Sequence, residues 1–166
     1  MSSPLARAVM RKDWVAAYRL LGTPFPFEWR SDGWQWLKAQ ATSGEDDDRF
    51  VVWGTRLALG AVDGPARGPV LAEVGFHGPP DPDGSVEIGY RVVSRHRRRG
   101  LAEEAVTAVL SWAAAHGADG VKASVSPDNV ASIALLHKLA FTATGSYRHP
   151  VLGEQLSFRR VARALP

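Results

Sequence analysis

The stretch Ser85–Ala102 reads SVEIGYRVVSRHRRRGLA, and the change of pattern within it decides the fold. Up to Val93 the residues alternate as in an extended strand, with Val86, Ile88, Tyr90 and Val92 on one face and Glu87, Gly89, Arg91 and Val93 on the other. A basic turn follows. From about Gly100 to His116 apolar residues recur at helical spacing, at Leu101, Ala105, Ala108, Val109 and Trp112. We therefore predict a strand, a turn and a helix in succession.

Helical and strand patterns alternate along the rest of the chain. Before this stretch we predict a broken helix over 5–21, a short helix over 33–40, strands over 50–59 and 70–76, a loop over 60–69 and a turn at Asp83-Gly84. After it we predict a strand over 121–125, a helix from about 128 to 139, and a hairpin of strands over 141–147 and 155–162. No repeat or long linker interrupts this order. It predicts one α/β domain over 1–166, with a helical segment over 1–45 and a sheet core over 46–166.

Composition and charge exclude several classes of protein. Of the 166 residues, 45% are hydrophobic and 22% are charged, the balance of an ordinary globular domain. The absence of cysteine excludes disulfides and a cysteine nucleophile, and the five histidines are scattered, so no metal site is expected. No stretch approaches the roughly 20 apolar residues of a membrane span, so we expect a cytoplasmic protein with no membrane partner. The net charge of +3 is too small to indicate nucleic-acid binding.

The basic turn has the chemistry of a phosphate-binding site. The first turn of a helix leaves N–H groups without intrahelical partners, and the helix dipole adds partial positive charge there. Gly100 and Ala102 lack side-chain bulk, so a diphosphate can approach the backbone, and the arginines within 95–99 strengthen the field. The residues alone leave open a solvated basic loop or a nucleic-acid patch. Their spacing matches neither the dinucleotide G-x-G-x-x-G nor a P-loop.

Three segments, in order, resemble the GNAT superfamily of N-acetyltransferases. Arg97-x-x-Gly100-x-Ala102 matches the R/Q-x-x-G-x-G/A signature of that family. The segment VEIGYRV at 86–92 is similar to its central strand, and NVASIALLHKLAF at 129–141 is similar to its N-x-x-S-I-x-x-L-x-K-L-G-F helix. The nearest branch contains the N-terminal acetyltransferases of ribosomal proteins. The resemblance implies an acyl-CoA-dependent N-acetyltransferase with a mixed, mostly antiparallel sheet of about six or seven strands. This sheet would be splayed at the cofactor cleft and flanked by about four helices, with the segment 1–45 on the acceptor side.

The resemblance also implies where acetyl-CoA would bind. The cofactor would lie where the strands over 85–93 and 121–125 separate, with the backbone of Val92 and Val93 paired to the pantetheine arm. The turn would hold the pyrophosphate through its amides and arginines, at Arg97, Arg98, Arg99, Gly100, Leu101 and Ala102. Asn129 would contact the pantetheine, and Ser132 lies one turn along the same helix. Helix capping or a surface turn is the alternative role for both.

Amide formation from a thioester needs a neutral amine, a polarised carbonyl and a tolerable leaving thiolate. An α-amino group, with a pKa of about 8, needs only a modest base, whereas lysine at about 10.4 needs more help. Glu87 is the first choice of base, acting directly or through water, because it lies near where the family often places a catalytic glutamate. Its alternative role is an ion pair with a nearby arginine. Glu73, on the neighbouring strand, is the second choice.

The tyrosine that many family members use to protonate the departing sulfur is missing. By spacing from Asn129 its position is held by Leu136, which cannot donate a proton. Ser132 or His137, one residue on from Leu136, could serve instead, or the thiolate could leave unassisted. Of these, His137 is expected to be a surface residue of the helix. A strand amide near Val92 is expected to stabilise the oxyanion. The departure at Leu136 keeps open a second function, an acyl-CoA sensor without turnover.

The sequence does not identify the acceptor, which could be a protein N-terminus or a small-molecule amine. Several tryptophans are expected to belong to the core rather than to an acceptor pocket, namely Trp14, Trp29, Trp34, Trp36 and Trp53. The acidic run Glu45–Asp48 is expected to be a solvated loop. A nucleic-acid-binding module using the run Arg95–Arg99 is the rival from another class, and the nearby Glu103 and Glu104 count against it. A homodimer would follow only by analogy with similar folds.

Overall fold

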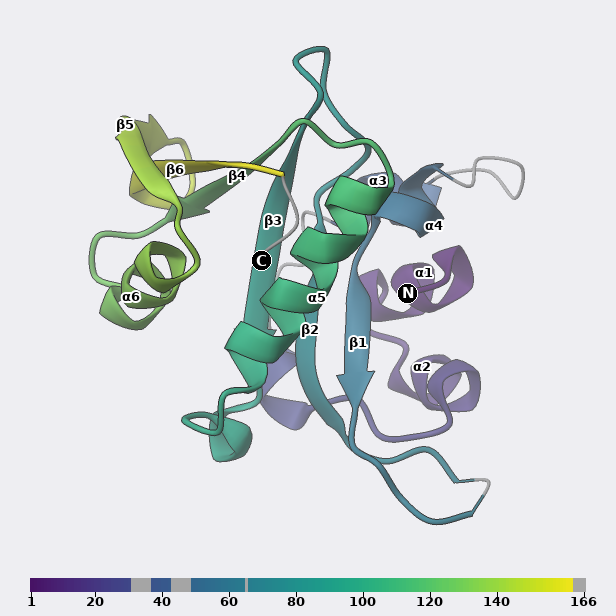
Figure 1. Cartoon of the computed structure of the whole chain (residues 1–166). Coiled ribbons are helices and arrows are strands. Elements are labelled where there is room, and N and C mark those ends of the chain that lie inside the picture. The colour runs from purple at the N-terminus through teal and green to yellow at the C-terminus, as the bar shows by residue number, and fades with distance from the viewer. Residues whose placement is uncertain (31–36, 43–48, 65, 163–166) are drawn as a thin grey trace. The chain divides into compact units, whose positions relative to one another are not determined.

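Helices and strands follow the order that the sequence predicts (Figure 1). The computed structural model describes residues 1–30, 37–42, 49–64 and 66–162. The α-helices within these ranges are α1 (Ser3–Met10), α2 (Trp14–Leu21), α3 (Lys38–Thr42), α4 (Arg49–Trp53), α5 (Leu101–Ala115) and α6 (Val130–Lys138). The strands are β1 (Arg56–Leu59), β2 (Val70–Phe76), β3 (Ser85–Val92), β4 (Gly120–Val125), β5 (Thr142–His149) and β6 (Gly153–Val161). Two short 3-10 helices, η1 (Phe27–Trp29) and η3 (Ser94–His96), complete these elements.

The strands form a mixed sheet in the order β1-β2-β3-β4-β6-β5. The pairs β1–β2, β4–β6 and β5–β6 are antiparallel, and β3–β4 is parallel. The predicted α/β fold with a mixed, mostly antiparallel sheet is confirmed. The ladder between β3 and β4 runs from Ser85 opposite Gly120 to Glu87 opposite Lys122, although β3 continues to Val92.

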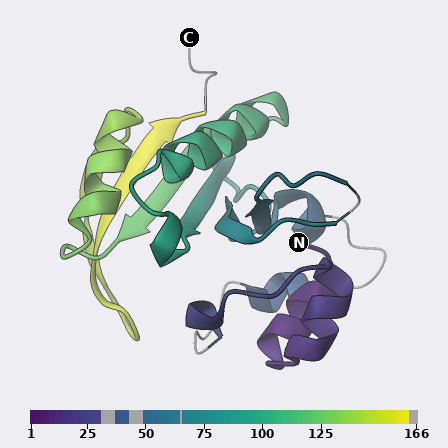
Figure 2. The same cartoon turned by 90° about the horizontal axis from the view of Figure 1, so that it is seen from below.

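The chain divides into two compact units. The first comprises Met1–Pro79 and Gly89–Ala105, and the second comprises Pro80–Ile88 and Val106–Pro166. In the first unit α1 lies beside α2 and also packs against α3 (Figure 2). The core of this unit is formed by buried residues of α1, α2 and the segments after them, including Leu5, Val9, Ala17, Leu21, Phe25, Trp29 and Leu37. In the second unit β4 buries one face, at Val121, Ala123 and Val125, as its alternation predicts.

The buried stripe of α5 differs from the predicted one. Its buried residues are Val106, Val109, Leu110 and Ala113. Ala108, which the predicted stripe includes, is exposed. Because this helix is rich in alanine and apolar on most sides, more than one stripe fits the helical period, and tertiary packing decides between them. Only Val109 belongs to both stripes.

The strand predicted over 50–59 is wrong in its first half. Arg49–Trp53 is the helix α4, and only Arg56–Leu59 is a strand. Val51 and Val52 are both about two-fifths exposed while Trp53 is buried against Phe76, with 5.7 Å between ring centroids. β-branched residues favour strands, but the Arg56 guanidinium donates to the carbonyls of Val52 and Gly54 and so supports the end of this helix.

The helices near the N-terminus are close to the prediction. The predicted break within 5–21 lies at Lys12, whose φ is 57°, and the Asp13 carboxylate then caps α2 by accepting from the Ala16 amide. Gly22 ends α2 in the left-handed conformation, as predicted. Of the helix predicted over 33–40, the part before residue 37 lies outside the described residues, and α3 continues to Thr42. Among the helices of the described ranges, none is long and apolar enough to cross a membrane.

Candidate active site

The segment between β3 and α5 forms a tight turn with exposed backbone amides. Arg98 and Gly100 have φ values of 59° and 78°, and such positive values are uncommon for a residue other than glycine. The Gly100 carbonyl accepts the Glu104 amide, so α5 begins directly after Gly100. Within the described ranges, no partner is found for the N–H groups of residues 98–102. An added Cβ at Gly100 would meet no atom within 4 Å, so the approach to the turn is open.

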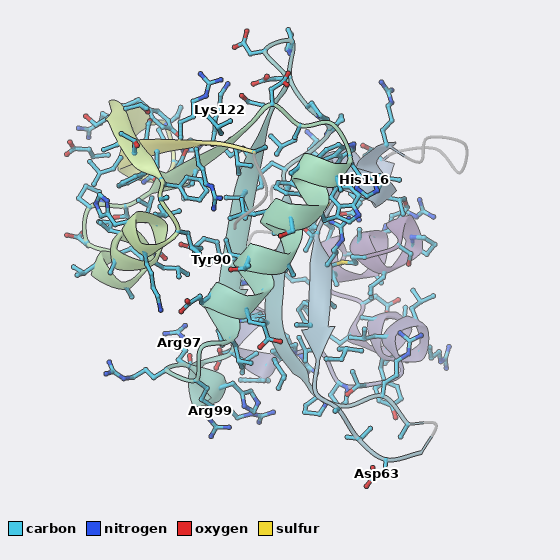
Figure 3. The ribbon with its side chains drawn as sticks, in the orientation of Figure 1. Asp63, Tyr90, Arg97, Arg99, His116 and Lys122 are labelled. Atoms are coloured by element: carbon cyan, nitrogen blue, oxygen red, sulfur yellow. The ribbon has the colours of Figure 1, made fainter. Side chains whose placement is uncertain are left out.

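Positive charge surrounds these amides. Arg97 and Arg99 extend from the loop that precedes α5 (Figure 3). The Arg97 Nε donates to the Val92 carbonyl at 3.1 Å, which ties the turn back to the end of β3. The turn therefore presents N–H groups, a helix N-terminus and guanidinium groups together, the combination that stabilises a phosphate group.

Val92 and Val93 differ in what their backbone groups already bind. The Val93 amide donates to Leu71, and the Val93 carbonyl accepts from His96. Because backbone groups alternate in direction along a strand, the Val92 amide points to the opposite edge of β3 from the Val93 amide. Arg97 bonds the Val92 carbonyl on that opposite edge. The Val92 amide is therefore the better placed of the two for a ligand that lies along this edge.

Glu87, the predicted base, projects from the unit that contains the β3–β4 ladder. Its Oε1 accepts a hydrogen bond from the Ser124 hydroxyl at 2.8 Å. Lys122 lies directly opposite Glu87 in the parallel register, and it pairs with Asp81 at 2.7 Å. The Glu87 side chain is only half-buried, so its carboxylate is oriented by Ser124 without being enclosed.

Glu73, the second choice of base, is committed to an ion pair. It is buried on β2, and its Oε2 accepts from the Arg91 Nε at 2.6 Å. The Arg91 guanidinium carbon lies 4.3 Å from the centroid of the Trp29 ring, a cation–π contact. A buried carboxylate held in this way is poorly suited to accept a proton, because protonation would leave Arg91 with its charge uncompensated.

The tryptophans follow the core prediction where they are described. Trp29 and Trp53 are buried, and Trp14 stacks on Phe25 with 5.5 Å between ring centroids. Trp34 and Trp36 lie outside the described residues, as does the acidic run 45–48.

The residues predicted on the last helix, α6, have clear structural roles. The Asn129 Oδ1 accepts the Ser132 amide at 3.1 Å, the helix-capping bond that was the alternative for Asn129. Leu136 is buried, at 1% exposure. His137 is an exposed helical residue, as predicted, and its ring meets the Phe158 ring edge-on.

The predicted site residues fall into two groups. In the first unit the structure brings together Val92, Val93 and the turn 97–102. In the second unit it holds Glu87, Asn129 and Ser132. Two side chains that contact these groups, Ser124 and Glu28, are not predicted from the sequence. Ser124 lies on the exposed face of a strand whose alternation was recognised, whereas Glu28 has no local signal.

Comparison with known proteins identifies the family of the chain. The family model of the acetyltransferase (GNAT) domain matches residues 4–142, most of the chain. The chain belongs to the GNAT acetyltransferase family. The predicted family is thus confirmed, and members of this family use acetyl-CoA as acetyl donor. Among the described residues, no cluster of three or more histidine, aspartate or glutamate side chains could hold a metal ion.

Two curated proteins of Bacillus subtilis (strain 168) resemble part of the chain. The uncharacterized N-acetyltransferase YjdG is 32% identical over 84 residues, covering 48% of this chain and 50% of YjdG. The uncharacterized N-acetyltransferase YoaA is 35% identical over 80 residues, covering 48% of this chain and 45% of YoaA. The chain thus spans about half the length of the curated relatives it matches.

A solved structure shares the GNAT fold. The ribosomal-protein-S5-alanine acetyltransferase from Vibrio fischeri superposes with a TM-score of 0.54 at 18% identity, covering 59% of this chain and 58% of that one. Ribosomal-protein acetyltransferases are therefore among the structural neighbours, as the sequence predicts. At this identity the similarity concerns the fold.

Proposed function

We propose that this GNAT chain transfers an acetyl group from acetyl-CoA to a primary amine. The main support for the proposal is the turn between β3 and α5. There the amides of residues 98–102 have no hydrogen-bond partner among the described residues. The side chains of Arg97 and Arg99 extend from the same loop. A pyrophosphate supplies the negatively charged acceptors that such amides need. The site thus fits the anionic part of coenzyme A.

Binding would use three features of the first unit. The amides of 98–102 and the N-terminus of α5 would bond the pyrophosphate oxygens, and Arg97, Arg98 and Arg99 would add charge. The Val92 amide would donate to the ligand along the edge of β3. Asn129 and Ser132 belong to the other compact unit, and their contacts with the pantetheine stay a prediction.

Bound acetyl-CoA supplies an activated thioester carbonyl. In the transfer, the amine nitrogen forms a bond to that carbonyl carbon, the carbon–sulfur bond breaks, and the amine gives up one proton. Glu87 would accept this proton, directly or through a water, with its carboxylate oriented by Ser124. The Val92 amide would stabilise negative charge on the carbonyl oxygen, a contribution typically worth about 3 kcal/mol.

The departing thiolate has no acid at the position that many family members use. Leu136 is buried and carries no proton donor. Ser132, one helical turn before Leu136, is the first candidate, and departure as a free thiolate is the alternative, because His137 is an exposed residue of the helix. Leu136 also supports a second candidate function, in which the chain binds acyl-CoA as a sensor without turnover.

A thiol-release assay separates these functions. Purified protein with acetyl-CoA is offered peptides with free N-termini, polyamines and amino acids, and the appearance of free CoA thiol is measured. An α-amino acceptor is expected to react at lower pH than a lysine side chain, because its pKa is about 8 rather than about 10.4. Release with one acceptor supports the enzyme. Tight CoA binding without release from any acceptor supports the sensor.

A further inference from the structure

Glu28, distant in the sequence, contacts the loop that leads into the turn 97–102. It lies in η1, and its Oε1 accepts the Ser94 amide at 2.7 Å, across 66 residues of chain. Ser94 is the first residue of η3, which ends directly before Arg97. The contact therefore lies at the start of the segment that carries the turn, and both residues belong to the first unit.

This contact provides a hydrogen-bond acceptor at the N-terminus of η3, where the loop itself supplies none. The N-cap position of η3 is Val93, whose side chain cannot accept a hydrogen bond, so no side chain of the loop itself caps the helix. Glu28 provides the missing acceptor. The bond to Ser94, aided by the charges of Arg97 and Arg95, holds the pKa of Glu28 below its ordinary value.

The backbone that presents Glu28 is itself fixed. Trp29, the next residue, is 3% exposed, and its ring lies under the Arg91 guanidinium. Downstream of Ser94, Arg97 is tied to the Val92 carbonyl. The loop is thus held at its start by Glu28 and at its end by Arg97.

We propose that Glu28 is a positioning residue for the turn, because its bond to Ser94 fixes the loop from which the amides of 98–102 are presented. This inference rests on the proposed function, since it assigns Glu28 a part in binding the pyrophosphate of coenzyme A. It adds a residue of the segment 1–45 to the determinants of cofactor affinity.

Two effects of removing Glu28 have opposite signs, which makes the inference testable. Loss of the Ser94 bond frees the loop and weakens binding of an anion. Loss of a negative charge near Arg95 and Arg97 strengthens binding of an anion. Positioning therefore predicts weaker binding in Glu28→Ala, and simple electrostatics predicts tighter binding.

The experiment is calorimetric titration of CoA into the wild-type chain and three variants of it. Glu28→Ala removes both bond and charge, and Glu28→Gln keeps an acceptor at the same place without the charge. Glu104→Ala, in the first turn of α5, removes a nearby charge but leaves its backbone bond to Gly100 intact. We expect the Kd to rise by roughly three- to tenfold in Glu28→Ala, less in Glu28→Gln, and not at all in Glu104→Ala. Equal or tighter binding by Glu28→Ala, or an equal loss in Glu104→Ala, overturns the inference.

Hydrogen exchange without ligand keeps the two proposals distinguishable. The Ser94 amide should exchange faster in Glu28→Ala than in the wild type, while the melting temperature stays close to that of the wild type because Glu28 is exposed. Unchanged exchange overturns the role of Glu28 whatever the ligand. Failure of the wild type to bind CoA overturns the proposed function instead.

Discussion

Ser124 donates a hydrogen bond to Glu87 across the two parallel strands β3 and β4, with 2.8 Å between Oγ and Oε1. The bond uses one oxygen of the carboxylate and fixes its direction. If Glu87 is the base, Glu87→Gln should lower kcat/KM by about 10²–10⁴-fold and leave the Kd for acetyl-CoA unchanged. Steady-state kinetics with the best acceptor, together with calorimetry, measure both quantities.

Ser124 provides the control for this assignment. Ser124→Ala should cost roughly tenfold in kcat/KM, because the carboxylate loses its orientation but not its basicity. Ser124→Thr keeps the hydroxyl and should restore most of the activity. Full activity of Glu87→Gln would show that a group other than Glu87 acts as the base.

Arg97 has two roles in the turn, a charge and a tether to Val92. Arg97→Ala should weaken CoA binding by roughly tenfold or more, because a hydrogen bond to a charged group and a favourable charge are both lost. Arg97→Lys keeps the charge without the Nε donor, so its affinity for CoA should lie between those of the wild type and Arg97→Ala. The dependence of Kd on salt separates the two roles: loss of charge should flatten it, whereas loss of the tether should leave it steep. Wild-type affinity in Arg97→Ala would exclude this residue from the site.

The ion pair between Lys122 and Asp81 should make a pH-dependent contribution to the stability of the fold. The hydrogen bond from Lys122 is the main cause that lowers the pKa of Asp81, followed by the bond from the Ser85 amide. Because the pKa is lowered in the folded state, the contribution is present above about pH 4, the ordinary value for aspartate, and is lost as the pH falls through the lowered pKa. Lys122→Met should therefore lower the melting temperature slightly at pH 7 and by less as the pH falls. A difference that is constant with pH would contradict this account.

Close packing of β2 against the segment before β1 leaves no room for a side chain at Gly75. A Cβ there would lie 2.6 Å from the Gly54 carbonyl oxygen and 2.7 Å from the Thr55 Cα, both backbone atoms. Gly75→Ala should destabilise the fold by about 1–3 kcal/mol in thermal or urea denaturation. The matched control is Gly89→Ala, whose Cβ would meet the His77 Nε2 at 2.8 Å, the end of a side chain that can move. Equal stability losses in both variants would argue against the backbone contact as the cause.

Much of the fold could be predicted because its elements carry strong local signals. The strand β2 matches its predicted bounds, and the turn at Asp83-Gly84 is present, with Gly84 at a φ of 69°. These signals are the alternation of apolar residues and the turn residues beside them. The helix α4 could not be predicted, because its valines favour a strand and its support comes from Arg56 and Phe76.

The candidate site could be predicted in part, for a similar reason. The turn Arg97–Ala102 is contiguous, so its sequence could suggest a phosphate-binding site, with a solvated basic loop and a nucleic-acid patch as the alternatives. The contacts of Ser124 with Glu87 and of Glu28 with Ser94 join residues 37 and 66 positions apart, and no local pattern reveals them. Such contacts depend on the register of the sheet and on the packing of η1.

The proposed function depends on the binding of coenzyme A by the turn between β3 and α5. The decisive measurement is calorimetric titration of acetyl-CoA and CoA into the wild type and into the Arg99→Glu, Gly100→Trp double variant. We expect micromolar binding by the wild type that disappears in the variant, because the variant reverses a charge and fills the open approach at Gly100. A wild type that binds neither ligand, or a variant that binds both as tightly, would contradict it.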